Sequence, residues 1–276
     1  MSFVLIKGRF VPKAGTPDGD SVRFRADDPT LWKRLEGRPV VLGTGLETKD
    51  TVQLRLEGID AIEKAATEPL AGEARQKLFA LVGYDPTRSP EPAGYILTRM
   101  TDDKSRRPIC FIFAGATSQK DGADVFLNAP LLRQSVNYKQ MLAGYAYPLY
   151  YNTLFADLRN AFTAALVKAK EAKRGYWPTD ATRKGVTISS SSQLATIAPI
   201  WPKLWRRLQE YLRTNDDLSG FIAFLAEQNE RIEVLDVMEE RGFQDLVKVK
   251  KNKVSLTQDP ENLRVVAEAG ARKRTR

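Results

Sequence analysis

The residues of this sequence best suited to chemistry are an arginine on a strand and two carboxylates in the loop that follows it. Apolar and polar side chains alternate over residues 52–57, which is the period-two pattern of a strand with one buried face. Arg55 lies on the polar face of this strand, Gly58 interrupts the pattern, and Asp60 and Glu63 follow in the next turn. An arginine can hold a phosphate through paired hydrogen bonds, whereas carboxylates can bind a metal ion or activate water. This order of residue types therefore suits phosphodiester chemistry.

Two other stretches place charged residues beside predicted strands. Residues 17–22 read P-D-G-D-S-V and put Asp18 and Asp20 in a turn before a second alternating strand. Residues 102–107 read D-D-K-S-R-R and lead into the apolar run I-C-F-I-F at 109–113. Taken alone, Asp-Gly-Asp is typical of a hairpin turn, because Asp and Gly tolerate the positive φ angles that such turns need.

The order D-G-D-S-V, then R-L-x-G-I-D-A-x-E, then D-K-x-x-R before a strand resembles the staphylococcal nuclease (thermonuclease) family. The resemblance covers about residues 3–177. It implies an α+β fold with an OB-type five-stranded β-barrel and three helices. It also implies a calcium-dependent hydrolysis of DNA and RNA phosphodiester bonds that leaves 3′-phosphate ends.

The resemblance assigns a calcium site and a residue that acts on water. Asp20, Asp60 and the backbone carbonyl of Ala61 would hold Ca²⁺, with Asp18 as an outer, water-mediated or turn-forming carboxylate. Such a set suits calcium, which accepts about six to eight oxygen ligands in irregular geometry. Glu63 would activate or orient the attacking water, although a lone glutamate in a loop is more often a solvated surface residue.

The remaining assigned residues would contact the substrate. Arg55 and Arg107 would bind the phosphoryl oxygens, over which charge spreads in the transition state. Lys104 would lie near the nucleotide phosphates, and Tyr147, with Tyr145 close by, would line the nucleotide pocket. Aromatic faces stack on bases of any sequence, which suits a nonspecific nuclease. The structural alternative is that these tyrosines plug the mouth of the barrel.

Three positions depart from the family pattern. Ile62 stands where the family usually has proline, so the loop from Asp60 to Glu63 would be less rigid. Ser105 replaces an aromatic residue that is often seen before the arginine, and Pro108 stands where glycine is common. None of these changes removes a charged catalytic group, so we expect activity.

Composition restricts the chemistry and the partners. The chain of 276 residues has 43 Lys and Arg against 34 Asp and Glu, and this formal net charge of +9 favours a polyanion, nucleic acid first and acidic membrane second. General solubility is the alternative reading of the charge. The absence of histidine excludes Ser-His and Cys-His mechanisms and histidine-bearing zinc sites. Cys110, the single cysteine, lies in an apolar run and should fill the core.

The first eight residues lack the basic segment and long apolar run of a signal peptide, and they read as a strand. No stretch approaches the roughly 20 apolar residues of a membrane span. We therefore expect a cytoplasmic monomer that binds DNA or RNA, preferably single-stranded, and has no membrane partner.

Apolar periodicity and turn residues predict the elements of a barrel domain over residues 1–178. Residues 26–51 would be an insertion, with a helical turn at 32–35 and a short strand at 40–42. The predicted strands are 3–11, 21–25, 52–59, 95–100, 108–113 and 124–127, and the predicted helices are 70–82, 128–142 and 155–174.

Beyond the barrel we expect a linker, a second module and a tail. Residues 179–197 contain a serine run and would be the linker, 198–266 a small α+β module, and 267–276 a basic tail. The module is predicted to contain helices at 203–212 and 218–228 and strands at 232–235 and 247–256 around a segment at 239–246.

Two other functions stay open. The barrel could bind single-stranded nucleic acid without cutting it, as OB-type barrels readily do. A mere binder has no need of Glu63, which argues against this alternative. In the other, the C-terminal module docks a protein partner of unknown identity while the barrel serves as a scaffold.

Overall fold

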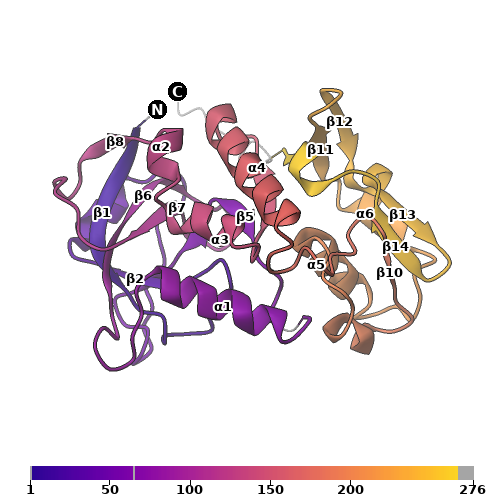
Figure 1. The fold of residues 1–276 in the computed structure, drawn as a ribbon, viewed down its shortest axis with the longest axis horizontal. Coiled ribbons are helices and arrows are strands. Elements are labelled where there is room, and N and C mark those ends of the chain that lie inside the picture. The colour runs from indigo at the N-terminus through magenta and orange to yellow at the C-terminus, as the bar shows by residue number, and fades with distance from the viewer. Residues whose placement is uncertain (1, 65, 267–276) are drawn as a thin grey trace.

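The computed structural model describes residues 2–64 and 66–266 and has a mixed α+β fold (Figure 1). A nearly closed, barrel-like sheet lies at one end of the molecule, and a group of shorter strands lies at the other. The long helix α4 (Ala156–Glu171) lies between the two. Within the described ranges, no helix is both long and apolar enough to cross a membrane.

The barrel-like sheet nearly closes through the stretch that carries Arg55. Its strand order is β3-β2-β1-β6-β7-β4, and β8 adds to β1. Since β3 and β4 are consecutive pieces of one stretch, the order begins and ends on the same segment, where β3 pairs with β2 and β4 pairs parallel with β7. The strands predicted at 3–11, 21–25, 95–100, 108–113 and 124–127 are confirmed, whereas the single strand predicted over 52–59 is divided into short pieces, the last of which joins another sheet. Their bounds are β1 (Ser2–Phe10), β2 (Arg23–Ala26), β3 (Val52–Gln53), β4 (Arg55–Leu56), β6 (Ala93–Thr101), β7 (Pro108–Ala114) and β8 (Asp124–Phe126).

Gly58 turns the central strand toward the candidate site. It follows β4 and begins β5 (Gly58–Asp60), with φ +80°, a left-handed backbone that favours glycine. A Cβ atom here would lie 2.6 Å from the ring of Phe162 on α4. Gly58 therefore lets the chain pass close to α4 as it leaves the barrel-like sheet. Asp60 is then placed in a different sheet. Cys110 is fully buried in the barrel core, as expected.

The helices packed on the barrel confirm two of the three predictions. The predicted helices 70–82 and 155–174 correspond to α1 (Leu70–Leu81) and α4. The single helix predicted over 128–142 is wrong, because two helices stand there, α2 (Ala129–Leu132) and α3 (Val136–Leu142). The Ser135 side chain caps α3 by accepting the N–H of Tyr138. Such a cap needs a non-helical backbone at its own position and so interrupts the helix.

The predicted insertion at 26–51 consists mainly of turns. Its helical part is the 3₁₀ helix η1 (Pro29–Arg34), whose Trp32 is buried against the barrel core, close to the predicted turn at 32–35. The strand predicted at 40–42 is not formed, and Val41 is exposed. An isolated bridge joins Gly43 to Lys49 instead.

The C-terminal part contains the two predicted helices and more strands than expected. The strand predicted over 247–256 is a hairpin, because Lys251 has a left-handed φ of +55° and turns the chain there. The elements are β9 (Tyr147–Tyr151), β10 (Val186–Thr187), η2 (Ser191–Ala195), α5 (Pro202–Tyr211), α6 (Phe221–Glu227), β11 (Arg231–Val234), β12 (Glu239–Gly242), η3 (Phe243–Leu246), β13 (Val247–Lys250), β14 (Lys253–Leu256), η4 (Pro260–Asn262) and β15 (Leu263–Val265).

One sheet crosses the boundary that the sequence places at 178. Its order is β12-β11-β15-β9-β5, so β15, near the end of the described chain, pairs parallel with β9, which pairs with β5. A second hydrophobic core likewise combines Ile62 and Leu149 with Trp201 and Val265. The C-terminal elements therefore share a sheet and a core with the residues around Asp60, which differs from the separate module expected.

The predicted linker also differs from an exposed connection. Within residues 179–197, β10 pairs with β14, and η2 covers part of the second core. Val186, Ile188 and Leu194 are buried, and an apolar side chain that is removed from water stabilises the segment that carries it. The predicted basic tail, 267–276, lies outside the described residues.

Candidate active site

Four carboxylates from two loops form the candidate site. Asp18 and Asp20 come from the loop before β2, Asp60 ends β5, and Glu63 lies in the loop after it. Asp20 Oδ2 accepts a hydrogen bond from the Ala61 N–H at 3.0 Å, which joins the loops directly. Asp18 closes its own turn by accepting from the Ser21 hydroxyl and the Asp20 N–H.

Gly19 and Gln140 hold the loops together. A Cβ atom at Gly19 would lie 2.7 Å from the Cβ of Ala61 and 2.8 Å from that of Ala74, so only glycine fits between them. The buried amide of Gln140, on α3, donates to the carbonyl of Gly19 at 2.9 Å and to that of Ala74 at 2.8 Å. Gln140 thus ties the Asp20 loop to α1, a role that its place in an amphipathic helix did not reveal.

Burial and neighbouring negative charges raise the pKa of two of these groups, Asp20 and Glu63. Burial raises the pKa of Asp20 well above its usual value, and the neighbouring Asp18 and Asp60 raise it further. Burial also raises the pKa of Glu63; Arg206 opposes this shift, and Asp60 and Asp18 add to it. A cation placed among these groups would relieve both effects.

Arg206, on α5, already places one cation there. Its guanidinium donates to both oxygens of Asp60, at 2.9 and 2.8 Å, and to Glu63 Oε1 at 2.8 Å. Although burial alone would lower the pKa of Arg206, these two carboxylates raise it well above its usual value. Sequence reasoning missed this residue, since an arginine on an amphipathic helix reads as a solvated charge.

Helix α5 is anchored firmly beside the site. The fully buried Trp201, at its start, donates its indole N–H to the Pro148 carbonyl of β9 at 2.9 Å. Pro148 stands opposite Ile59 of β5, the strand that ends at Asp60. Leu204 and Leu208 are buried in the second core on the same helix. The contact between Arg206 and the carboxylates therefore follows from how α5 packs.

Arg55 and Arg107 are brought to neighbouring positions around Asp102. Arg55 stacks over the Tyr151 ring, 5.2 Å from its centroid, and donates to its hydroxyl at 2.9 Å. Although burial alone would lower the pKa of Arg55, the Tyr151 hydroxyl that it bonds and the carboxylates of Asp60 and Asp102 raise it. Arg107 lies 3.4 Å from Asp102 through its Nε and is about one-third exposed. Asp102, to which sequence reasoning gave no role, thus lies within electrostatic reach of both arginines.

The three departures from the family pattern fit into this arrangement. The Ser105 hydroxyl donates to Asp102 and accepts from Arg107 Nε at 2.7 Å, so it helps to fix the arginine. Pro108 begins β7, opposite Thr101 of β6. Ile62 is buried in the second core, which holds its loop by packing instead of by a proline ring.

Both tyrosines predicted to contact the nucleotide pack on Tyr176 and hydrogen-bond to other protein side chains. Tyr147 is fully buried, stacks on Tyr176 with centroids 5.5 Å apart, and donates to Asp180 at 2.6 Å. Its face is therefore covered by protein, which favours the structural alternative for this residue. Tyr145 is half-buried and donates to Glu73 at 3.0 Å, and Lys104 is exposed on the turn before Arg107.

The donor set fits calcium chemically. Asp20 and Asp60 offer hard carboxylate oxygens, the type of ligand that Ca²⁺ prefers, and Ala61 lies between them. Burial and then the charges of Asp18 and Asp60 raise the pKa of Asp20, and a bound cation would favour its ionised form. Among residues 2–64 and 66–266, however, no three acidic or cysteine side chains are already grouped as metal ligands. Both Asp60 oxygens bond Arg206 instead.

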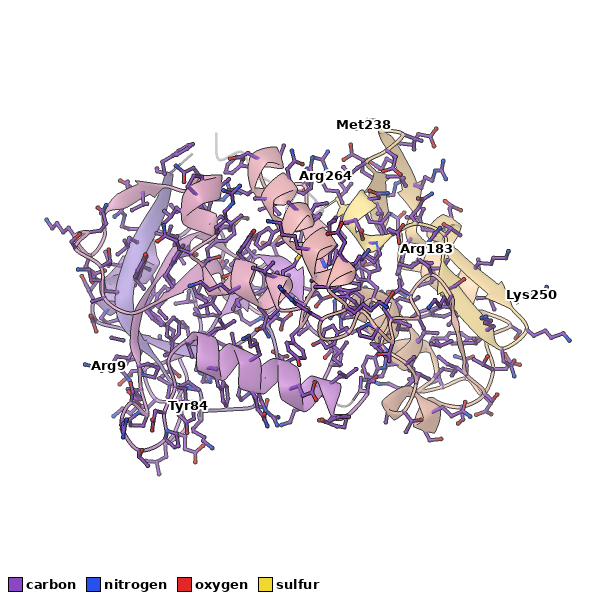
Figure 2. The ribbon with its side chains drawn as sticks, in the orientation of Figure 1. Arg9, Tyr84, Arg183, Met238, Lys250 and Arg264 are labelled. Carbon is purple, nitrogen blue, oxygen red and sulfur yellow. The ribbon has the colours of Figure 1, made fainter. Side chains whose placement is uncertain are left out.

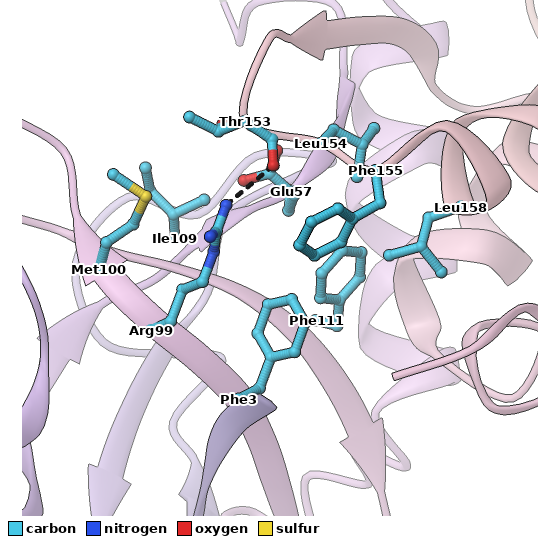
Figure 3. A pocket seen from close by; sticks show the side chains of 10 residues that line it. All are labelled: Phe3, Glu57, Arg99, Met100, Ile109, Phe111, Thr153, Leu154, Phe155 and Leu158. Carbon is cyan, nitrogen blue, oxygen red and sulfur yellow. Dashed lines mark hydrogen bonds between the residues drawn. The ribbon is translucent and has the colours of Figure 1, made fainter. Parts of the chain in front are cut away.

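Neither the cavity of the barrel nor the basic surface offers a second site for a phosphodiester. A small cavity beside β6 and β7 is lined mainly by apolar side chains, among them Phe3 and Phe155, and Arg99 donates across it to the Thr153 carbonyl at 2.8 Å (Figure 3). It is too apolar for a phosphodiester. Basic side chains occur at both ends of the molecule, as Arg9 and Lys250 show (Figure 2), so the net charge marks no single face.

No protein-family model and no curated protein matches the chain. The functional assignment therefore rests on the residues themselves and on their geometry.

Proposed function

We propose that the protein is a calcium-dependent nuclease with an OB-type barrel, and that it hydrolyses phosphodiester bonds of DNA and RNA, preferably single-stranded. The observation that carries the proposal is the meeting of Asp20, Asp60 and Glu63 from two loops, with Asp60 within electrostatic reach of Arg55. A fold that has only to bind nucleic acid needs no such buried group of carboxylates, because each costs free energy to desolvate.

In this proposal Asp20, Asp60 and the Ala61 carbonyl would hold Ca²⁺, which when bound would neutralise phosphate charge and orient the scissile group. Arg55 and Arg107 bind the non-bridging phosphoryl oxygens, and their guanidinium groups are already oriented by Tyr151 and by Asp102 and Ser105. Preorganised cations stabilise the developing charge without further rearrangement.

Glu63 accepts the proton of the attacking water or orients that water. The water oxygen then bonds to phosphorus while the bond from phosphorus to the 5′-oxygen breaks. The 5′-oxygen takes up a proton from solvent, so the products are a 3′-phosphate and a 5′-hydroxyl, as the resemblance implies. Burial raises the pKa of Glu63, which makes its carboxylate a better proton acceptor than a solvated glutamate.

The test is cleavage of single-stranded DNA and RNA by the purified chain, with calcium and with EGTA. Arg107→Ala should lower the rate about 100-fold or more, the scale on which loss of a transition-state donor acts. Arg106→Ala, in the same turn, is the matched control and should keep most of the activity. Equal losses in both variants would contradict the role of Arg107, and absence of cleavage with calcium, magnesium or manganese would refute the nuclease.

One observation favours a second candidate, an OB-type module that binds nucleic acid without turnover. Arg206 engages Glu63, the residue proposed to act on water, and Asp60, the proposed metal ligand. Binding of single-stranded DNA without cleavage under all metal conditions would favour this candidate.

A further inference from the structure

Arg206 stands where the proposed function requires a metal ion. Its two terminal nitrogens bond both oxygens of Asp60 and one of Glu63, all within 2.9 Å. Forked, charge-assisted hydrogen bonds of this kind are among the strongest that side chains make. One of the two negative charges of this pair is thus offset by a cation that belongs to the chain itself.

The fold fixes the backbone of Arg206, but the end of its side chain can be displaced. Trp201, Leu204 and Leu208 fix α5 through the second core. The Arg206 side chain itself is 37% exposed, while Asp60 is only 6% exposed. The guanidinium can therefore rotate toward solvent about its flexible stem while α5 stays in place.

We propose that Arg206 is an internal competitor for the metal, so that Ca²⁺ and the guanidinium bind Asp60 in mutually exclusive states. Two cations cannot share both oxygens of one buried carboxylate without strong repulsion. Calcium must displace Arg206, and the same displacement frees Glu63 to meet water. The apparent affinity for calcium is the intrinsic affinity of the free site multiplied by the fraction of molecules in which the site is free. The inference rests on the proposed function, whose metal site it uses.

The test compares calcium binding by the full chain and two variants, with calorimetry and the metal alone as probe. Arg206→Met keeps an unbranched apolar stem and removes the charged guanidinium group. This variant should bind Ca²⁺ about tenfold or more tightly than the parent, corresponding to a site that is free in about one molecule in ten. Arg207→Ala is the matched control, because Arg207 is the next residue of α5 and bonds Glu210 and Glu230 instead of the carboxylates of the site. It should bind calcium like the parent.

Thermal unfolding gives a second reading. Arg206→Met leaves Asp60 and Glu63 without their cation, so it should melt below the parent in EGTA and recover when calcium is added. Unchanged or weaker calcium binding by Arg206→Met, or no binding by any form, would overturn the competition. Absence of cleavage by a variant that binds calcium more tightly would instead refute the nuclease and leave the competition standing.

Discussion

Replacing Gly58 with alanine should destabilise the protein strongly, although it adds a single methyl group. Gly58 has φ +80°, and its added Cβ would lie 2.6 Å from Phe162. A left-handed backbone costs an alanine about 1–2 kcal/mol. Forcing a methyl group into a packed core costs about 1–3 kcal/mol more. We therefore expect Gly58→Ala to lower the free energy of unfolding by about 2–5 kcal/mol.

Urea unfolding followed by tryptophan fluorescence measures this loss. The matched control is Gly115→Ala, because Gly115 has a similar φ of +85° but a Cβ there meets nothing within 4 Å. The control should lose only the backbone cost, about 1–2 kcal/mol. Phe162→Leu, which removes the ring atom in conflict, should recover part of the difference when combined with Gly58→Ala.

Equal destabilisation of Gly58→Ala and Gly115→Ala would refute the reasoning, since it would show that the Phe162 ring yields without cost. A double variant whose losses simply add would lead to the same conclusion. The site would respond as well, because Gly58 separates the strand of Arg55 from that of Asp60.

Two further predictions concern polar contacts away from the catalytic groups. Although burial opposes it, hydrogen bonds from Arg207 and Lys203 lower the pKa of Glu230 from 4.5 to about 2. This difference corresponds to about 3 kcal/mol of stability, which is fully present above pH 4.5 and lost as the pH falls through about 2. In urea unfolding, the free energy of unfolding of Glu230→Gln should therefore lie furthest below that of the parent at pH 7, and the difference should shrink toward pH 3. A difference that does not change with pH would contradict this. Tyr147→Phe should lower the free energy of unfolding by about 1–3 kcal/mol, because it loses the hydrogen bond to Asp180. Its binding of single-stranded DNA, measured by fluorescence anisotropy, should be unchanged. Weaker binding would indicate that Tyr147 contacts the nucleotide after all.

The barrel strands could be predicted because each has one buried face or is apolar throughout. The alternation over residues 52–57 places Leu54 and Leu56 in the core, as the structure confirms. Strand β9 was missed because residues 147–150 are all buried, which removes the period-two signal, and Pro148 argues against a strand. Its place between β5 and β15 depends on pairings between distant segments, which local periodicity does not report.

The charged residues of the site could be proposed from motif order, but their partners could not. Asp20 and Asp60 meet as expected. Arg206 lies 146 positions from Asp60, and nothing in its local sequence distinguishes it from Arg207, which pairs elsewhere. Tyr147 illustrates the opposite limit, because a motif match placed it in a pocket that the second core closes.

The parallel pairing of β15 with β9 has a consequence for the order in which the chain acquires its structure during synthesis. All strands of the barrel-like sheet lie within residues 2–126, so they can pair early. Strand β5 gains its sheet only with β9, and β9 gains its other neighbour only when Val265 has left the ribosome. Arg206 also follows Asp60 and Glu63, whose repulsion is unrelieved until α5 docks. We therefore expect the barrel to form first on the nascent chain and the carboxylate loops to become ordered last.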